Sequence, residues 1–135
     1  MHTEKIEKDW HCERMPYPLK LKWLRHERLW RLTDDFVYID ERGRKVICTA
    51  EYVTDLGTVP RLLRPFLSVV EWAEAFVVHD WFCDGHGWAD GSSGTRKQGD
   101  RLLREIAIFT GHSRWKAQVV YALVRSYAVV AGKDN

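Results

Sequence analysis

The stretch FVYIDERGRKVICTAEYVT, residues 36–54, determines the class of fold. Its two apolar runs are separated by the polar segment 41–44, whose glycine is typical of a turn. The pattern predicts a β-hairpin, with Phe36–Asp40 as the outgoing strand and Lys45–Thr54 as the returning strand. Further strand-forming residues lie upstream in 29–32, so we expect a small antiparallel sheet in this half of the chain.

Helical signals follow after residue 58. Ser68 with Glu71, and Thr95 with Gln98, fit the capping box, in which side chains in the first helical turn bond each other's backbone N–H groups. The boxes predict helices over about 69–82 and 96–110, and Ser113 predicts a third over about 114–131. Pro60 predicts a short helix over 61–64.

Apolar residues recur at helical spacing in all three longer segments, and this spacing predicts the faces that pack inward. In the first segment the inward face also carries a histidine and a cysteine. The predicted inward residues are Trp72, Phe76, His79 and Cys83 in the first helix, Leu102, Leu103, Ile106 and Phe109 in the second, and Trp115, Val119, Ala122, Leu123 and Val129 or Val130 in the third.

These elements predict an α+β fold, with a small antiparallel β-sheet from the N-terminal half packed against a C-terminal cluster of three helices. A chain of 135 residues has the size of one domain. We divide it into an N-terminal arm over 1–18, which is loose or forms a short helix, a β-rich part over 19–57 and a helical part over 58–132.

The composition excludes several classes of protein. Hydrophobic residues make up 45% of the chain and charged residues 30%, which is typical of a globular protein rather than a disordered one. No apolar run approaches the roughly 20 residues that cross a bilayer, so we expect no membrane association. Met1–Asp9 lacks the apolar segment of a secretory signal. The three cysteines include no C-x-x-C pair, which favours reduced thiols in a cytosolic setting.

The charge balance argues against nucleic-acid binding. The formal net charge is +2 and the isoelectric point is about 8.5, below the value of about 9 that marks a nucleic-acid-binding domain. Basic residues do gather between Lys20 and Arg31, together with Trp23 and Trp30. We interpret this segment as a solvated surface, because Lys and Arg are mostly exposed residues.

Three carboxylates and a histidine are the candidate catalytic or metal-binding residues. His79 and Asp80 are adjacent on a predicted helix, and an imidazole and a carboxylate can bind one divalent metal together. Asp100 lies at the edge of an inward face, where an unpaired carboxylate is costly, so it needs a metal or a salt bridge to Arg61, Arg64 or Arg125. Asp55 follows the last predicted strand, and either caps the next turn or points at the His79 helix.

The glycine-rich segment 84–94 supplies further candidates. We expect it to be a long surface loop, and Asp84, His86 and Trp88 in it, together with Arg61, are candidate substrate-binding residues. Cys83 is close enough in sequence to be a ligand, but no second cysteine is spaced to join it. Of the seven tryptophans, Trp72, Trp81 and Trp115 are expected to fill the core, and exposed ones would mark a recognition surface.

Several motifs occur in order along the chain: Phe36-Val37-Tyr38, the phrase YVTDLGTVPR over 52–61, His79-Asp80-Trp81-Phe82, and TRKQGDR over 95–101. The sequence thereby resembles a family of bacteriophages and prophages catalogued as domain of unknown function 1353, over about residues 29–131. The family's phrases are of the kind F-V-T-D-x-A-S-V-P-R, H-D-W-L-Y and S-R-x-x-A-D. This sequence departs from them at Gly57, Thr58, Cys83 and Gly99.

The resemblance implies a viral or prophage origin, and therefore a site of action in the host bacterial cytoplasm or in the virion. It also implies that Asp55, His79, Asp80 and Asp100 are the positions that the family's motifs single out, and all four are present. It implies no particular activity. The departures at Cys83 and Gly99 affect local packing rather than these chemical groups.

Two functions remain open from the sequence. The first is a small phage-encoded hydrolase, in which His79, Asp80 and Asp100 hold zinc, manganese or magnesium, or in which His79 and an aspartate form an acid–base pair; Asp55 is a further catalytic residue. Its substrate would be a cell-wall peptide or a phosphoester. The second is a non-catalytic phage accessory protein, either a tail or assembly component or an inhibitor that binds a host protein.

Overall fold

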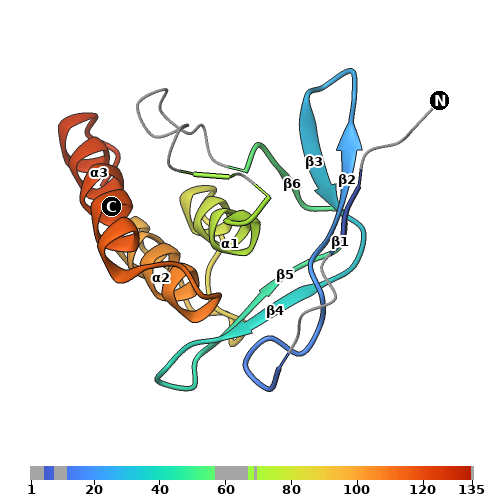
Figure 1. Ribbon diagram of the computed structural model, residues 1–135, viewed down its shortest axis with the longest axis horizontal. Coiled ribbons are helices and arrows are strands. Elements are labelled where there is room, and N and C mark those ends of the chain that lie inside the picture. The colour runs from blue at the N-terminus through green and yellow to red at the C-terminus, as the bar shows by residue number, and fades with distance from the viewer. Residues whose placement is uncertain (1–4, 8–11, 57–66, 69, 135) are drawn as a thin grey trace.

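Six strands precede three helices in the described part of the chain (Figure 1). The structure is a computed structural model and describes residues 5–7, 12–56, 67–68 and 70–134. The strands are β1 (Lys5–Glu7), β2 (Lys20–Leu24), β3 (Leu29–Leu32), β4 (Phe36–Ile39), β5 (Lys45–Cys48) and β6 (Val53–Thr54); the helices are α1 (Ala73–Cys83), α2 (Arg96–Phe109) and α3 (Arg114–Val130). The α+β class is confirmed. The short helix predicted over 61–64 lies outside the described residues.

The strands form two small antiparallel sheets. One contains β4 and β5, with Phe36 opposite Cys48 and Ile39 opposite Lys45, so the predicted hairpin is confirmed here. Its turn is closed by Asp40, whose carboxylate accepts backbone N–H bonds from Arg42 at 2.9 Å and Arg44 at 2.7 Å. The other sheet has the order β1-β2-β3-β6.

Two details of the predicted β structure are wrong. The returning strand predicted over Lys45–Thr54 is divided, because β5 ends at Cys48 and β6 pairs with β3 instead of β4. A turn causes the division: the Tyr52 N–H donates to the Thr49 carbonyl at 3.1 Å, and Glu51 adopts φ 76°. The N-terminal arm also differs from its prediction, since residues 5–7 form β1 and pair with β2.

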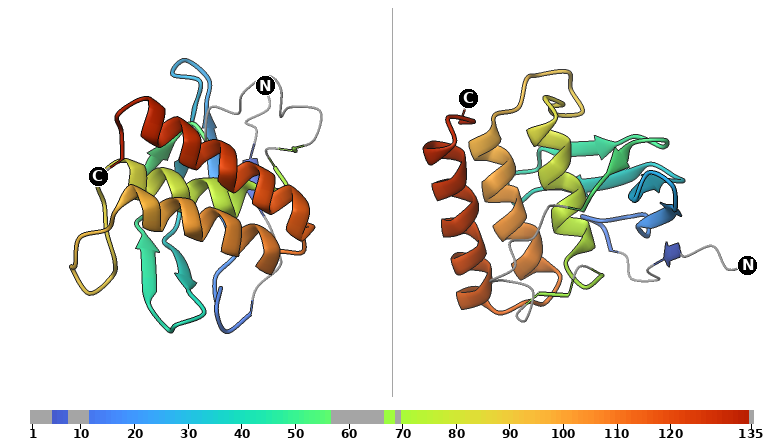
Figure 2. Two further views of the ribbon diagram at one scale, coloured as in Figure 1. Left: turned by 90° about the vertical axis from the view of Figure 1, so that its left-hand side faces the viewer. Right: turned by 90° about the horizontal axis from the view of Figure 1, so that it is seen from above.

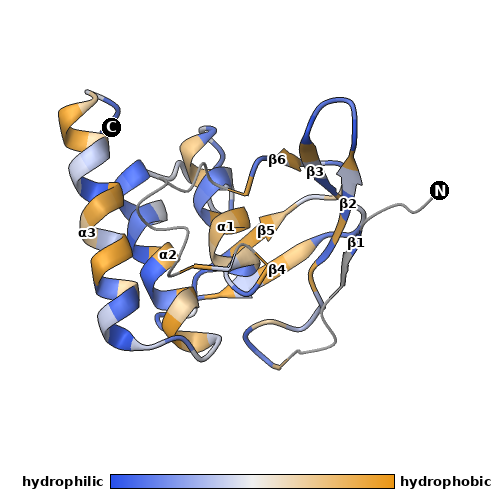
Figure 3. Cartoon of the chain, turned by 45° about the horizontal axis from the view of Figure 1, so that its top comes forward, coloured by the Kyte–Doolittle hydropathy of each residue, from blue (hydrophilic) through white to orange (hydrophobic). Residues whose placement is uncertain are grey.

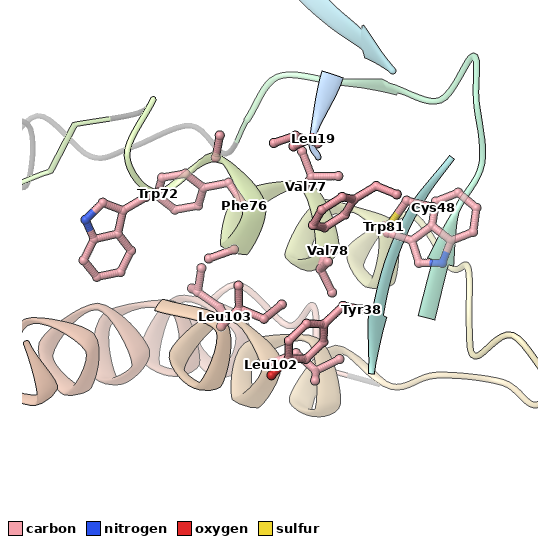
Figure 4. Close-up of a cluster of buried hydrophobic side chains, with 14 of the residues drawn as sticks. Leu19, Tyr38, Cys48, Trp72, Phe76, Val77, Val78, Trp81, Leu102 and Leu103 are labelled. Carbon is pink, nitrogen blue, oxygen red and sulfur yellow. The ribbon is translucent and has the colours of Figure 1, made fainter. Parts of the chain in front are cut away.

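Helix α1 is the centre of the fold. It lies between the strands and α2, and α3 covers the opposite side of α2 (Figure 2). Nearly every α1 side chain is therefore buried, including the polar Glu74 and His79 as well as the apolar residues. Figure 4 shows Phe76, Val77 and Val78 of α1 in one cluster with side chains of α2 and of the β4–β5 hairpin. Trp72 and Trp81 are buried in this core, as predicted.

The helix starts follow the sequence signals to different degrees. The capping box of α2 is confirmed, because Thr95 Oγ1 accepts the Gln98 N–H at 3.1 Å and Gln98 Oε1 accepts the Thr95 N–H at 3.0 Å. Ser68 Oγ accepts the Glu71 N–H at 3.4 Å, but α1 begins later than predicted, at Ala73. Ser113 is the N-cap of α3, although its side chain makes no capping hydrogen bond.

The contrast between the two caps gives a first prediction. We expect Thr95→Ala to lower the free energy of unfolding by about 1 kcal/mol, because it removes a hydrogen bond to a backbone N–H that the helix cannot satisfy itself. Ser113→Ala is the matched control and should change stability less, since no such bond is lost. Urea denaturation measures both, and equal losses for the two variants would contradict the assignment.

The predicted inward face of α3 is wrong. Trp115 is 61% exposed and Val130 is 88% exposed, and Val119, Leu123 and Val129 are exposed as well. The helix instead packs through its smaller apolar residues Ala117, Val120 and Ala128, which form a second stripe at helical spacing. Figure 3 shows that hydrophobic segments continue along α3 at the edge of the molecule. No helix in the described ranges has both the length and the apolar character needed to cross a bilayer.

Candidate functional site

The candidate site gathers at the C-terminal half of α1. This part of the helix carries His79, Asp80 and Cys83. The second turn of α2 brings Asp100, and α3 brings Arg125. Close approach of α1 and α2 depends on Gly99, since a Cβ atom there would lie 2.6 Å from Phe82 Cβ. The glycine that departs from the family's phrase therefore lets Asp100 reach α1.

His79 and Asp100 form a short buried pair. His79 Nε2 lies 2.6 Å from Asp100 Oδ1, and the side chain of Asp100 is 0% exposed. The other carboxylate oxygen, Oδ2, accepts a hydrogen bond from Arg125 Nη1 at 2.9 Å. The guanidinium group compensates the carboxylate in an environment where an unpaired charge would be costly. Of the two partners left open for Asp100, the structure shows the salt bridge to Arg125.

Arg125 is itself held by a second carboxylate. Its Nη1 and Nη2 atoms donate to Asp134 at 3.1 and 2.8 Å. The hydrogen bonds with Asp134 and Asp100 raise the pKa of Arg125, and the pairing lowers the pKa of Asp134. Asp134, which follows α3, is therefore connected through Arg125 and Asp100 to the buried imidazole of His79.

The pairing decides which nitrogen of His79 carries a proton. With an ionised Asp100, Nε2 must be the donor, so in the neutral imidazole the lone pair is on Nδ1. The Nδ1 atom lies 4.0 Å from Asp80 Oδ1. Asp80 is oriented by β6, because the hydroxyl of Thr54 donates to its Oδ2. The nitrogen that can accept a proton, His79 Nδ1, therefore lies close to the Asp80 carboxylate.

Cys83 is close to His79 but is not an activated nucleophile. Its Sγ lies 3.8 Å from Nδ1 and 3.6 Å from Nε2, so it is not aligned with either nitrogen alone. Burial raises the pKa of the Cys83 thiol to about 12, against the lowering effect of Arg96. The thiol is therefore protonated at neutral pH, and thiol chemistry requires the thiolate.

At the end of β6, Thr54 rather than Asp55 contacts the His79–Asp80 part of α1. Asp55 is exposed, whereas Thr54 is buried and contacts Asp80. Thr54 is the last residue of β6, and its side chain points toward α1, while Asp55 follows the strand. The Thr54 hydroxyl also accepts the Leu56 N–H at 3.0 Å, which fixes its orientation.

The predicted substrate-binding residues do not form one group. Asp84 accepts a hydrogen bond from the Tyr52 hydroxyl at 2.6 Å, and His86 stacks on Trp81 with a centroid separation of 4.0 Å. Burial and the bond to Asp84 raise the pKa of Tyr52, and Asp80 contributes to the same shift. Asp84 and His86 therefore lie at the end of α1 that carries Asp80.

Trp88 lies elsewhere and is 7% exposed, which corrects its expected place on an exposed loop surface. It packs against Phe82, donates to Gln98 Oε1 at 3.2 Å and lies beneath Arg44. Arg61, the remaining candidate, lies outside the described residues.

The arrangement favours an acid–base pair over a metal centre of His79, Asp80 and Asp100. Both oxygens of Asp100 are engaged, one by His79 and the other by a guanidinium cation. Within the described ranges, no group of three or more His, Cys, Asp or Glu side chains is placed to hold an ion. Metal binding by His79 and Asp80 stays a prediction.

A sequence comparison assigns the chain to a family. The family described as "Protein of unknown function (DUF1353)" matches residues 30–124. The chain belongs to this family. The matched region of this DUF1353 protein includes His79, Asp80 and Asp100 and ends one residue before Arg125.

One relative among curated proteins is the "Uncharacterized protein y4iH" of Sinorhizobium fredii (strain NBRC 101917 / NGR234), which is 29% identical over 100 residues. The match covers 71% of this chain and 39% of the relative, so the chain spans about two fifths of the relative's length. No solved structure matches the chain.

Proposed function

We propose that this DUF1353 protein is a small hydrolase in which His79 is the general base and Asp100 orients it. The 2.6 Å contact between His79 Nε2 and Asp100 Oδ1 carries the proposal. A buried carboxylate that fixes one nitrogen leaves the other nitrogen in the correct tautomer to accept a proton. Asp100 would also stabilise the imidazolium that forms, because its carboxylate contacts the ring at Nε2.

The proposed reaction uses a water molecule at the Nδ1 side of His79. Nδ1 removes a proton from the water as its oxygen attacks an acyl or phosphoryl centre, and the imidazolium then returns the proton to the leaving group. Asp80, 4.0 Å from Nδ1, stabilises the positive ring electrostatically. Asp84 and His86 at the same end of α1 are the proposed contacts for substrate.

The substrate classes remain a cell-wall peptide bond and a phosphoester. The phage or prophage origin that the family resemblance implies favours the first, because a virus must cross or lyse the wall of its host. The protein would then act in the host cytoplasm or in the virion. A divalent metal would serve the second class by lowering the pKa of a bound water, with His79 and Asp80 as its proposed ligands.

A turnover screen with and without a chelator tests the proposal. We expect purified protein to hydrolyse one of three substrates: bis(p-nitrophenyl) phosphate, a p-nitrophenyl ester or purified peptidoglycan. Because the proposed base is a histidine held by a carboxylate, EDTA should leave the rate unchanged within about twofold. Loss of turnover with EDTA, together with metal detected by elemental mass spectrometry, would show that the site is a metal centre rather than an acid–base pair. No turnover on any substrate by folded protein would refute the hydrolase.

One observation favours the alternative function, a non-catalytic accessory protein. Helix α3 exposes large apolar side chains at helical spacing, Trp115, Val119, Leu123 and Tyr127. Such a stripe is typical of a protein interface. In this alternative the His79–Asp100–Arg125 contacts only stabilise the packing of the helices, and the partner is a host protein or a virion component. Trp115→Arg should then abolish partner binding without a change in thermal stability, while His79 variants should affect stability alone.

A further inference from the structure

A second polar site lies along a face of α2 between the β4–β5 turn and the start of α3, apart from the face that contacts α1. It is an open pocket of about 760 Å³. Gln98, Arg101 and Glu105 contribute to its lining, whereas Gly99 and Asp100 contact α1. At 100° per residue these two sets fall on different faces of one helix. His79, Asp80, Cys83, Asp100 and Arg125 are absent from the lining, so the pocket is separate from the proposed hydrolytic site.

The pocket is strongly basic. Six arginines and three carboxylates line it, and they come from the residue 14 segment, the β4–β5 turn, α2 and the start of α3. The arginines are Arg14, Arg42, Arg44, Arg101, Arg104 and Arg114; the carboxylates are Asp40, Glu41 and Glu105.

Two of the three carboxylates are already engaged by the protein. Asp40 accepts the two backbone N–H bonds that close the β4–β5 turn. Glu105 accepts hydrogen bonds from Arg14 at 3.3 Å and from the Tyr38 hydroxyl. Burial and the bond to Glu105 raise the pKa of Tyr38, so the phenol keeps its proton. Of the six arginines, Arg14 is thus the one neutralised by a carboxylate of the lining.

The other five arginines have no carboxylate within 4.0 Å among the described residues. Two of them are nevertheless held in place by neutral groups. Arg44 lies 3.8 Å above the Trp88 ring and donates to Ser92 Oγ at 3.1 Å, while Arg104 donates to Gln118 Oε1 at 3.0 Å. Such contacts order a guanidinium group without cancelling its charge, which lowers the entropic cost of binding an anion.

We propose that this pocket binds an organic polyphosphate such as a nucleoside triphosphate. Guanidinium groups match phosphate oxygens in paired hydrogen bonds, and five of them without carboxylate partners suit a ligand with several negative charges. Leu102, Ile108 and Phe109 provide an apolar wall for the organic part of the ligand. The volume lies within the range of about 300–1,000 Å³ that small-ligand pockets occupy.

Calorimetric titration of the full chain at about 0.15 M salt tests the proposal. The probes are ATP, sodium tripolyphosphate, adenosine, sodium sulfate and a single-stranded oligonucleotide. We expect ATP to bind at one site per chain, tripolyphosphate to bind more weakly, and adenosine and sulfate not to bind measurably. Binding of sulfate as tight as that of ATP, tighter binding of the oligonucleotide than of ATP, or no binding of ATP would each overturn the proposal.

Variants localise the site. Arg101→Gln and Arg114→Gln should each weaken ATP binding about tenfold, because each removes a charged hydrogen-bond donor to phosphate. Both residues are exposed, so the fold should be retained. Arg25→Gln removes the same charge from the β2–β3 turn and should leave binding unchanged; an equal loss in this control would refute the pocket. His79→Gln should also leave ATP binding unchanged, which separates this proposal from the hydrolase.

Discussion

His79→Gln is expected to lower kcat of the hydrolase by about 10²- to 10⁴-fold, which is the usual contribution of a general base. Glutamine retains an amide N–H that can donate to Asp100 in place of His79 Nε2, so the buried carboxylate keeps a partner. Its other atoms cannot take a proton from water near neutral pH. The measurement is kcat on whichever substrate the wild-type protein hydrolyses, together with a thermal melt of the variant.

The control for this variant is His26→Gln, because His26 is an exposed histidine in the turn between β2 and β3. Its kcat should equal that of the wild type. A His79→Gln protein that melts like the wild type and retains its kcat would exclude His79 as the base. A variant that unfolds would instead assign the His79–Asp100 pair to stability, as the accessory-protein alternative requires.

The sequence predicts the burial of Asp100 and names Arg125 among three possible arginine partners, but it does not choose between them or between an arginine and a metal. The residue lies on an inward stripe of a strongly capped helix, so a compensating group was required. Arg125 lies 25 residues further along the chain, and its contact depends on how α3 is rotated against α2. That rotation was misjudged, because α3 has two apolar stripes and the sequence favoured the one with larger side chains. Ala117, Val120 and Ala128 allow closer packing and form the buried one.

The connection between β6 and α1 is a second place where the orientation of a side chain depends on tertiary packing that the sequence does not reveal. The motif over 52–61 points to Asp55, either as a cap of the next turn or as a carboxylate facing the His79 helix. In the structure Asp55 is exposed, whereas Thr54 is buried in β6, opposite Trp30 of β3. The orientation of Thr54 depends on the pairing of β6 with β3. The sequence does not predict this pairing, because the predicted hairpin includes Thr54 in the strand that returns along Phe36–Asp40.

Asp100→Ala is expected to lower the free energy of unfolding by about 3–5 kcal/mol, the cost of breaking a buried charge pair on one side. It leaves the His79 Nε2 proton without its acceptor and Arg125 Nη1 without one of its two. The stability of a domain of this size is about 5–15 kcal/mol, so this loss is a large fraction of the total. Urea denaturation at neutral pH measures it.

Asp134→Ala is the matched control for this loss. It removes the other carboxylate that binds Arg125, but Asp134 is solvent-accessible and water can replace it. We expect its midpoint of urea denaturation to lie much closer to the wild type than that of Asp100→Ala. Equal midpoints for the two variants would show that the buried pair contributes no more than the exposed one.

Asp100→Asn separates the structural from the chemical role of Asp100, and remains usable if the alanine variant does not fold. Its carboxamide keeps the size of the side chain, and its oxygen can still accept from Arg125. Its NH₂ group would then face His79 Nε2 and donate to it, which places the ring proton on Nδ1. The base would be in the wrong tautomer, so kcat should fall by about 10⁴-fold in a protein that remains folded. Wild-type kcat in a folded Asp100→Asn protein would contradict the role of Asp100 in orienting the base.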